Sequence, residues 1–488
     1  MISAKDLSRI SRRRFLSASG SAVALGGVLG SVAACAFPKV LAAQSSDGYF
    51  DLVAAPGRAP LLGDEGPATD IWAYGGTSPG PVIRVRQGAP VKVRLHNNLP
   101  EPTSTHWHGI RIDNAMDGVS GLTQDAVPPG GTFDYDFIAP DAGTYWYHSH
   151  NRSWEQMARG LYGPLIVEET APLPVDRELL LVIDDWRLHQ DGRIHEESFG
   201  AMMDWSHGGR MGNWLTINGV STPELKVKRG ERLRLRLINC ANARTLSLKF
   251  GGEVAPQVMA LDGQPLAGPE APGSGGVLTL APAQRADLLL DVDLAPGTRV
   301  LLSEVSRQEG VAIGSFLCDG VVEGGLAGSA LPLLAPNVLP APDLSDPLKL
   351  GLVMEGGAMG GLGSAVFEGR ELSMRELVAK GQVWAFNGVA GMTGKPLASV
   401  RRGRSVVLDF VNRTGWPHGM HIHGHHFRII ARDGKPVSNG PWRDTELVEA
   451  NEAVTVAFVA DNPGKWLLHC HMLEHQAAGM KTWFEVVG

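Results

Sequence analysis

The chain has 488 residues and a formal charge of −7, and its 61 Gly and 32 Pro residues make up almost a fifth of it. A chain of this length exceeds one ordinary core, so we expect roughly two to four domains. The turn-forming residues interrupt the β-branched and aromatic runs at short intervals, which favours short strands and an all-β fold.

Residues 1–43 are predicted to be an export signal. Arg12 and Arg13 in SRRRFL precede an apolar stretch of small residues, and KVLAAQSS then offers a cleavage site. The segment resembles a twin-arginine signal, which predicts a periplasmic or secreted protein. Two alternatives are a basic arm followed by an apolar helix in the cytoplasm, and a lipoprotein whose VAAC motif ends at Cys35.

The chain beyond this signal is acidic and lacks a long apolar run. Residues 1–43 hold six Lys or Arg and one Asp, so 38 basic and 50 acidic residues remain, a net charge of −12. This sign disfavours nucleic acid or an anionic membrane surface as a partner. No apolar run after residue 45 approaches the roughly 20 residues of a membrane span. We expect a soluble protein that acts as a monomer.

Three segments repeat one pattern, starting at Pro79 (PGPVIRVRQGAPVKVRLHNNL), Thr222 (TPELKVKRGERLRLRLINCAN) and Lys395 (KPLASVRRGRSVVLDFVNRTG). In each, a turn Gly is followed nine residues later by an Asn, and the apolar alternation between them predicts a strand with one buried face. The pairs are Gly88 with Asn97, Gly230 with Asn239, and Gly403 with Asn412.

The repeats predict three similar β-sandwich domains, at residues 46–170, 176–338 and 346–488, joined by Pro-rich linkers. Only the first and third domains share a further motif, because AGTYWYHSH and PGKWLLHCH each place a Gly five residues before a His. Histidine therefore marks a feature of the outer domains that the middle domain lacks.

Ten of the 16 histidines fall in four clusters. A lone His is usually an ordinary surface or core residue, but four clusters in symmetric positions of two domains favour a metal site. Successive side chains of a strand point to opposite faces, so each H-x-H pair places two imidazoles on one side. We expect four such pairs to meet between the first and third domains. The clusters are His106 and His108; His148 and His150; His418, His421 and His423; and His469, His471 and His475.

The same alternation separates Cys470 from its neighbours in the segment HCH. Its sulfur must face away from the imidazoles of His469 and His471, so it belongs to a second site, which we assemble with His418, His475 and Met480. Two His nitrogens, a thiolate and a distant thioether describe a blue-copper electron-transfer centre. Zinc accepts Cys and His, but favours closed tetrahedral sites and gains nothing from a thioether.

The four clusters, in this order, resemble the four copper-binding motifs of the multicopper oxidases, and the match covers nearly the whole chain beyond the signal. The resemblance implies three cupredoxin-like Greek-key domains and four copper ions. It also implies that electrons from a small reductant pass from a type 1 copper through Cys470 to His469 and His471, where dioxygen is reduced to water. The implied ligands are His418, Cys470 and His475 with axial Met480 for type 1; His106 and His421 for type 2; and His108, His148, His150, His423, His469 and His471 for the type 3 pair.

Two carboxyl groups, those of Asp117 and Glu474, are candidates for proton delivery to the predicted copper cluster. Asp117 matches a carboxylate that relays protons in relatives, or it is simply a turn residue before Gly118. Bilirubin oxidases and copper-efflux oxidases carry Glu directly after the second type 1 His, but here that position is Gln476. Either Glu474 or water would then have to substitute.

Two residues are candidates for contact with substrate. Trp416 resembles a Trp of bilirubin oxidases at the same spacing, or it packs against His418. Asp444 anchors a phenol or aniline, or it forms a structural ion pair with Arg443 or another Arg.

We therefore predict a laccase-like oxidase of phenols, anilines and other small reductants. The first alternative is a metal oxidase acting on Cu(I) or Mn(II), although the region before the third repeat holds only Met354, Met359 and Met374. A copper-free scaffold protein of the same fold is disfavoured, because every ligand position is filled. Cys240 and Cys318 either form a disulfide or remain buried thiols.

Overall fold

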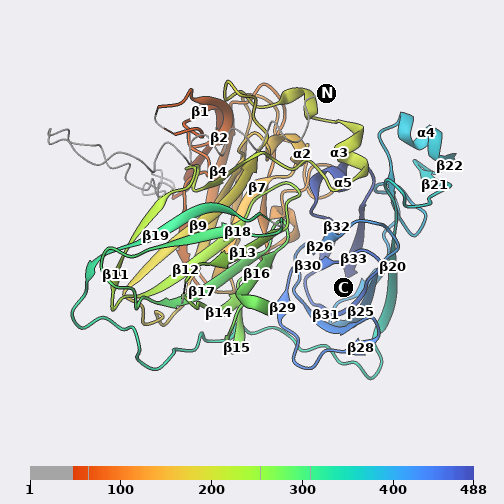
Figure 1. Cartoon of the computed structure of the whole chain (residues 1–488). Coiled ribbons are helices and arrows are strands. Elements are labelled where there is room, and N and C mark those ends of the chain that lie inside the picture. The colour runs from red at the N-terminus through yellow and green to blue at the C-terminus, as the bar shows by residue number, and fades with distance from the viewer. Residues whose placement is uncertain (1–47, 64, 253, 308) are drawn as a thin grey trace. The chain divides into compact units, whose positions relative to one another are not determined.

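The computed structural model describes residues 48–488 apart from 64, 253 and 308 (Figure 1), so the predicted export signal and Cys35 lie outside the described residues. The structure is 48% strand and 7% helix, which confirms the all-β class. None of the helices in the described part of the chain has the length and apolar composition that a membrane crossing requires. Cys240 and Cys318 are buried free thiols, so the disulfide alternative is wrong.

The first sandwich has two four-stranded sheets, of order β2-β1-β4-β6 and β3-β8-β7-β5. Their elements are β1 (Phe50–Ala59), β2 (Thr69–Tyr74), β3 (Ile83–Arg86), β4 (Pro90–Asn97), β5 (Thr105–His108), β6 (Thr132–Ile138), β7 (Gly143–Ser149) and β8 (Tyr162–Glu168), with the 3-10 helix η1 (Asn114–Met116) and helix α2 (Ser153–Gln156) in the connections.

The second sandwich has a six-stranded sheet, β10-β9-β12-β17-β14-β15, and a five-stranded sheet, β11-β19-β18-β13-β16. Its elements are β9 (Arg177–Trp186), η2 (Glu196–Ser198), α3 (Met202–Ser206), β10 (Trp214–Ile217), β11 (Glu224–Arg229), β12 (Arg232–Asn239), β13 (Leu246–Phe250), β14 (Gln257–Leu261), β15 (Gln264–Glu270), η3 (Ser274–Gly276), β16 (Val277–Leu280), β17 (Arg285–Asp291), β18 (Arg299–Glu304) and β19 (Val311–Val321).

The third sandwich pairs the sheet β23-β20-β25-β31-β27-β28, which also holds β29, with the sheet β24-β33-β32-β26-β30; β21 and β22 form a separate hairpin. Its elements are β20 (Leu348–Gly356), β21 (Ser364–Phe367), β22 (Arg370–Ser373), α4 (Met374–Ala379), β23 (Trp384–Phe386), β24 (Ser399–Arg401), β25 (Arg404–Asn412), β26 (His418–Ile422), β27 (Phe427–Arg432), β28 (Lys435–Pro436), β29 (Trp442–Arg443), β30 (Thr445–Val448), β31 (Ala453–Ala460), β32 (Gly464–Cys470), α5 (Leu473–Ala477) and β33 (Lys481–Val487).

Equivalent pairs of strands show that the three sandwiches share one topology. Each contains two parallel pairs among antiparallel ones, and these involve the strands on either side of the repeat Gly: β1 with β4 and β3 with β8, then β9 with β12 and β11 with β19, then β20 with β25 and β24 with β33. The repeat Gly has a positive φ in every copy, 79° at Gly88, 92° at Gly230 and 82° at Gly403, a conformation that a residue with Cβ adopts at a cost. This confirms three cupredoxin-like domains.

The repeat Asn fastens the end of its strand to the loop that follows. Asn97 donates to the carbonyls of Glu101 (2.9 Å) and Val127 (2.8 Å) and accepts the N–H of Leu99 (3.0 Å). Asn239 and Asn412 make equivalent bonds in the other domains. The Asn side chain is therefore a structural residue of the repeat, because it ties the end of its strand to two carbonyls and one N–H of the neighbouring backbone.

Replacement of Asn97 by Ala should therefore lower the free energy of unfolding of the first domain by about 2 to 4 kcal/mol, because buried backbone groups lose their partners. Urea denaturation measures this loss. Asn98→Ala, at the exposed adjacent position, is the matched control and should change stability by less than about 0.5 kcal/mol. Equal stabilities of the two variants would contradict this role.

Candidate metal centre

Two hairpins, one in each outer domain, carry the H-x-H pairs in the same way. On β5 and β7 of the first domain, His106 lies directly opposite His148. On β26 and β32 of the third domain, His421 lies directly opposite His469. The second His of each pair lies at the end of its strand or just beyond it, on the same face as the first. Each hairpin therefore presents four imidazoles from one edge.

The structure brings these eight imidazoles together between the two outer domains. Their ligand atoms form three groups, two of which share His108, and within each group all the ligand atoms lie within 4.8 Å of one another. Every group joins side chains of the first domain to side chains of the third. The groups are His108, His148 and His471; His150, His423 and His469; and His106, His108 and His421.

Hydrogen bonds to the outer ring nitrogens orient several of these rings. The Nδ1–H groups of His148 and His469 donate to the carbonyls of Ser149 and Cys470, each at 2.9 Å. His423 Nδ1 donates to the Asp117 carboxylate at 3.0 Å. A neutral imidazole carries one ring hydrogen, so these bonds leave the Nε2 atoms bare.

The Nε2 atoms face one another in pairs, and in the pair of His423 and His469 both nitrogens are bare. His423 Nε2 lies 3.1 Å from His469 Nε2, and His148 Nε2 lies 3.4 Å from His471 Nε2. Burial lowers the pKa of all four imidazoles well below the ordinary value, so a proton is disfavoured as the bridge. Two nitrogen ligands of one metal ion, each bound at about 2.0 Å, lie roughly this far apart. The donor set therefore fits metal ions.

Cys470 faces a second, separate site, as the strand alternation predicts. Its Sγ lies 3.6 Å from His418 Nδ1 and 3.7 Å from His475 Nδ1, and the two nitrogens are 3.1 Å apart. The opposite nitrogens are occupied, His418 Nε2 by the Thr414 hydroxyl (2.8 Å) and His475 Nε2 by the His207 carbonyl (2.6 Å). Both Nδ1 atoms are thus directed at the sulfur and at the space between them.

Burial perturbs both kinds of ligand in the second site. It raises the pKa of the Cys470 thiol to about 12 and lowers that of His475 to about 4. A thiol in this environment ionises only beside a cation, which a bound metal would supply. Met480 is fully buried in the same core cluster, and its N–H donates to the His475 carbonyl at 2.9 Å.

Asp117 lies between a His of each outer domain. Its carboxylate is 1% exposed; it lies 3.2 Å from His106 Nδ1 and accepts from His423 Nδ1. The His106 Nδ1–H also donates to the Asp117 carbonyl at 2.7 Å. Asp117 therefore does more than form the turn before Gly118.

Glu474 is a buried carboxyl group beside the second site. Its Oε1 accepts from Asn242 at 2.9 Å, and its Oε2 has no hydrogen-bond partner among the described residues. Burial raises the pKa of Glu474 to about 7, so it exchanges a proton near neutral pH. Gln476 is also buried.

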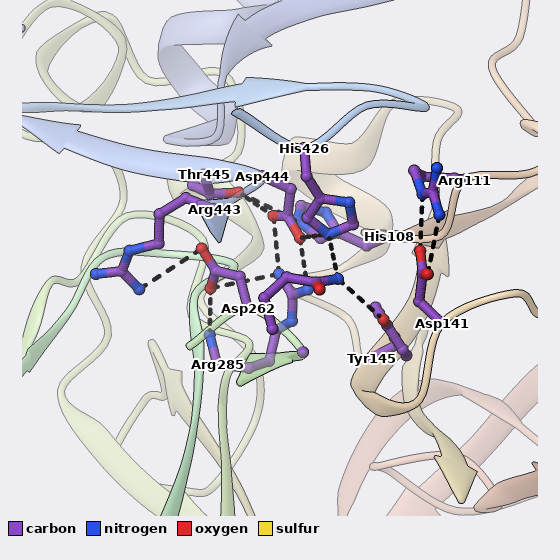
Figure 2. A network of polar contacts seen from close by, with 12 residues as sticks. His108, Arg111, Asp141, Tyr145, Asp262, Arg285, His426, Arg443, Asp444 and Thr445 are labelled. Carbon is purple, nitrogen blue, oxygen red and sulfur yellow. Dashed lines mark hydrogen bonds and ion pairs between the residues drawn. The ribbon is translucent and has the colours of Figure 1, made fainter. Parts of the chain in front are cut away.

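The structure decides between the two predicted roles of Asp444, one of the two candidate substrate residues. Asp444 has no exposed surface, and its carboxylate accepts hydrogen bonds from Nη1 and Nη2 of Arg285, at 2.9 and 2.6 Å (Figure 2). A phenol in solvent cannot reach it, and Arg443 instead lies near Asp262. The structural ion pair was the correct alternative, with Arg285 of the middle domain as the partner.

Trp416 does not stack on His418. The ring that packs against both His418 and His475 is Trp384, with centroid distances of 5.1 and 4.4 Å. Trp416 is partly exposed and packs on His207 at 5.3 Å. It therefore lies on the surface that covers His475.

Three contributing residues escaped the sequence reasoning. Trp384 and His207 approach the second site from positions far from its ligands in the chain, and Arg285 is the first residue of β17 in the middle domain. Trp384 lies in the segment WAFNG, a Trp followed by a turn just upstream of the third repeat. No motif marked His207 or Arg285.

Multicopper oxidase family profiles match the chain at residues 58–172, 177–308 and 370–487. The multicopper oxidase MmcO of Mycobacterium tuberculosis is 32% identical over 528 residues, covering 98% of this chain and 97% of that protein. A solved multi-copper oxidase from Pseudomonas thermotolerans aligns with a TM-score of 0.76 and 32% identity, over 90% of this chain and 98% of its own. Lac15, from a marine microbial metagenome, aligns with a TM-score of 0.71 and 41% identity, over 89% and 99%.

The chain therefore belongs to the multicopper oxidase family, as its four His clusters predicted. It is a copper-dependent oxidase that uses dioxygen and takes electrons from a reductant or a metal ion.

The raised pKa of Glu474 predicts a pH dependence of stability. The folded chain keeps a proton, up to about pH 7, that the unfolded chain releases near pH 4.5. The resulting stabilisation is complete below pH 4.5 and is lost as the pH rises to 7, by about 3 kcal/mol. Urea denaturation of the metal-free protein across this range measures the loss.

Glu474→Gln lacks the titrating carboxyl group, so its loss of stability between pH 4.5 and 7 should be smaller than that of the wild type by about 3 kcal/mol. Glu449→Gln removes an exposed carboxylate of the same domain and should follow the wild type. A Glu474→Gln profile parallel to that of the wild type would contradict the assignment.

Proposed function

We propose that the protein is a laccase-like oxidase, which takes single electrons from phenols, anilines and other small reductants and uses them to reduce dioxygen to water. The observation that carries this proposal is the segment from His469 to His471, whose three side chains belong to two sites. Copper ions in the two sites would supply the redox chemistry, one accepting electrons and the others passing them to dioxygen. The chain's own part is to bind, orient and isolate those ions.

Four copper ions, one of type 1, one of type 2 and a type 3 pair, fit the donor groups. His418, Cys470 and His475 would hold a type 1 copper through two nitrogens and a sulfur, and Met480 would be the fourth ligand. Two groups of three histidines suit the type 3 pair, His108, His148 and His471 for one ion and His150, His423 and His469 for the other. His106 and His421 then remain for the type 2 copper; their Nε2 atoms lack partners among the described residues.

Asp117 is the proposed proton relay, because its carboxylate contacts imidazoles of both outer domains. Its oxygens lie 3.0 Å from His423 Nδ1 and 3.2 Å from His106 Nδ1, at the cluster where water formation would consume protons. Glu474 is the proposed second donor, since Gln476 cannot exchange protons.

The remaining proposals concern the chain outside the metal sites. We propose that residues 1–43 are a twin-arginine export signal and that the mature protein acts as a monomer in the periplasm or outside the cell. Lipidation at Cys35 is the alternative. The domain boundaries at 46–170, 176–338 and 346–488 agree with the order of the sheets.

Oxidation of Cu(I) or Mn(II) is the second candidate function, and exposed thioethers favour Cu(I) within it. Met203, Met211 and Met359 are 67%, 37% and 88% exposed. All three lie on or beside the loop of His207. Met211 Cε lies 3.2 Å from a Cβ built at Gly208, and the N–H of Ala358, the residue before Met359, donates to the Ser206 carbonyl. Thioethers are soft ligands and suit Cu(I).

Oxygen uptake with a phenol, Cu(I) and Mn(II), at matched copper loading, distinguishes these candidates. A laccase-like enzyme should give its highest kcat/KM with the phenol, and a metal oxidase with one of the two ions. A fully loaded protein that consumes oxygen with none of these donors would contradict both, and would favour a scaffold of the same fold.

Cys470→Ser should abolish the intense blue absorbance and turnover and bind one copper fewer per chain, because an alcohol replaces the thiolate. Visible spectroscopy and metal analysis measure both effects. Cys318→Ser, which alters a buried thiol far along the chain in the middle domain, is the control and should stay blue. An unchanged spectrum in Cys470→Ser would exclude the type 1 assignment.

A further inference from the structure

The middle domain contributes one charged side chain to the surroundings of the His cluster. Arg285 begins β17 and is fully buried. Its Nη1 and Nη2 donate to the two oxygens of the Asp444 carboxylate, at 2.9 and 2.6 Å, in a bidentate pair (Figure 2). Such a pair fixes the plane of the carboxylate as well as its position.

Further contacts fix the guanidinium of Arg285 itself. Its Nε donates to the Thr144 carbonyl of the first domain and its Nη1 to the Ala283 carbonyl of its own domain, each at 3.2 Å. Asp262 accepts the backbone N–H of Arg285 at 3.0 Å. With Asp444 in the third domain, Arg285 therefore contacts all three domains.

The carboxylate that Arg285 holds is bonded to a residue of the His cluster. Asp444 Oδ1 lies 3.1 Å from His108 Nε2 and accepts the Thr445 hydroxyl at 2.8 Å. Because Asp444 is an ionised acceptor, the hydrogen of His108 must lie on Nε2. Nδ1 is then bare; it has no partner among the described residues and belongs to a ring grouped with His148 and His471.

The backbone beside His108 is shaped to admit this ion pair. Gly109 has a φ of +85°, and a Cβ at this position would lie 2.4 Å from Arg285 Nη2 and 2.5 Å from Asp444 Oδ2. The ion pair is thus packed against the main chain beside His108, with no room for a side chain at position 109.

We propose that Arg285 is a positioning residue for the type 3 site: by clamping Asp444, it fixes the ring orientation and the hydrogen of His108, so that Nδ1 is presented to copper. This inference rests on the proposed function, because that function assigns His108 to the type 3 pair. Removing one partner of a buried pair leaves the other charge uncompensated, so Asp444 would move or take up a proton. His108 would then lose its fixed acceptor, and partners of this kind typically change metal affinity by 10- to 100-fold.

The experiment compares Arg285→Lys with Arg232→Lys in copper-loaded protein. Lysine keeps the charge but loses the bidentate fork. Arg232 is a buried arginine of the same sheet; it makes a bidentate pair with Asp291 at 2.7 and 2.8 Å, and among the described residues the other hydrogen-bond partners of its guanidinium are Ser329 and Ala330. Three quantities are measured. Metal analysis gives the copper per chain, the blue absorbance and the EPR signal report the type 1 copper, and the near-ultraviolet absorbance with loss of EPR signal reports the coupled type 3 pair.

Arg285→Lys should keep the blue absorbance and the type 1 EPR signal while the affinity for the type 3 copper falls about 10- to 100-fold and its signature is lost. Arg232→Lys should keep both. A wild-type type 3 signature in Arg285→Lys would overturn the positioning role alone. Loss of the type 1 and type 3 signals together, or loss of the type 3 signature in Arg232→Lys, would show a general structural role and also overturn it.

The proposed function is tested separately by the wild type. A wild-type protein without a type 3 signature at full loading would overturn the proposed function, and this inference with it. If Arg285→Lys does not fold, nitrogen NMR of the metal-free wild type decides the question, with His108→Gln to assign the signal. The hydrogen of His108 is expected on Nε2, and a hydrogen on Nδ1 would overturn the proposal.

Discussion

The opposite orientation of neighbouring side chains on β32 is the constraint on which both metal sites depend. His469 and His471 face the imidazoles of the first domain, while Cys470 between them faces His418 and His475 within the third domain. A shift of one residue in the register of β32 would exchange these faces and dismantle both donor sets. Pairing of β32 with β26 and β33 fixes that register.

Burial then determines the chemical state of the ligands. Desolvation lowers the pKa of seven imidazoles of the cluster, and bonds to backbone carbonyls and carboxylates fix which ring nitrogen carries the hydrogen in several of them. The seven are His108, His148, His150, His421, His423, His469 and His471. Cys470 is coupled to the cluster through its own backbone, because its carbonyl accepts from His469 Nδ1 at 2.9 Å. The ligands of the two sites therefore lie on opposite faces of β32, yet His469 and Cys470 are joined by one peptide unit.

The middle domain supports both sites without contributing a His to their metal-ligand groups among the described residues. Its Arg285 holds Asp444 against His108, and the carbonyl of its His207 accepts the Nε2–H of His475. The imidazole of His475 is buried, and His207 and Trp416 pack against each other beside it. On the proposed function, an electron donor would approach His475 across this surface.

The sequence carried enough information for the fold class, the three domains and the separation of the two donor sets, because these follow from a repeat and from strand alternation. Positions such as Arg285, His207 and Trp384 could not be found in this way, since they act through contacts between segments far apart in the chain. Asp444 shows the limit clearly: its chemistry allowed a substrate anchor or an ion pair, and only its burial against Arg285 decided between them. The copper types, the domain boundaries and the export signal stay predictions.

Anomalous X-ray diffraction at the copper edge, from crystals of the loaded protein, tests the central claim most directly. One peak is expected between Cys470, His418 and His475, and three among the eight imidazoles of the outer domains. A single shared site, or a map without a peak beside Cys470, would contradict the division of ligands by β32.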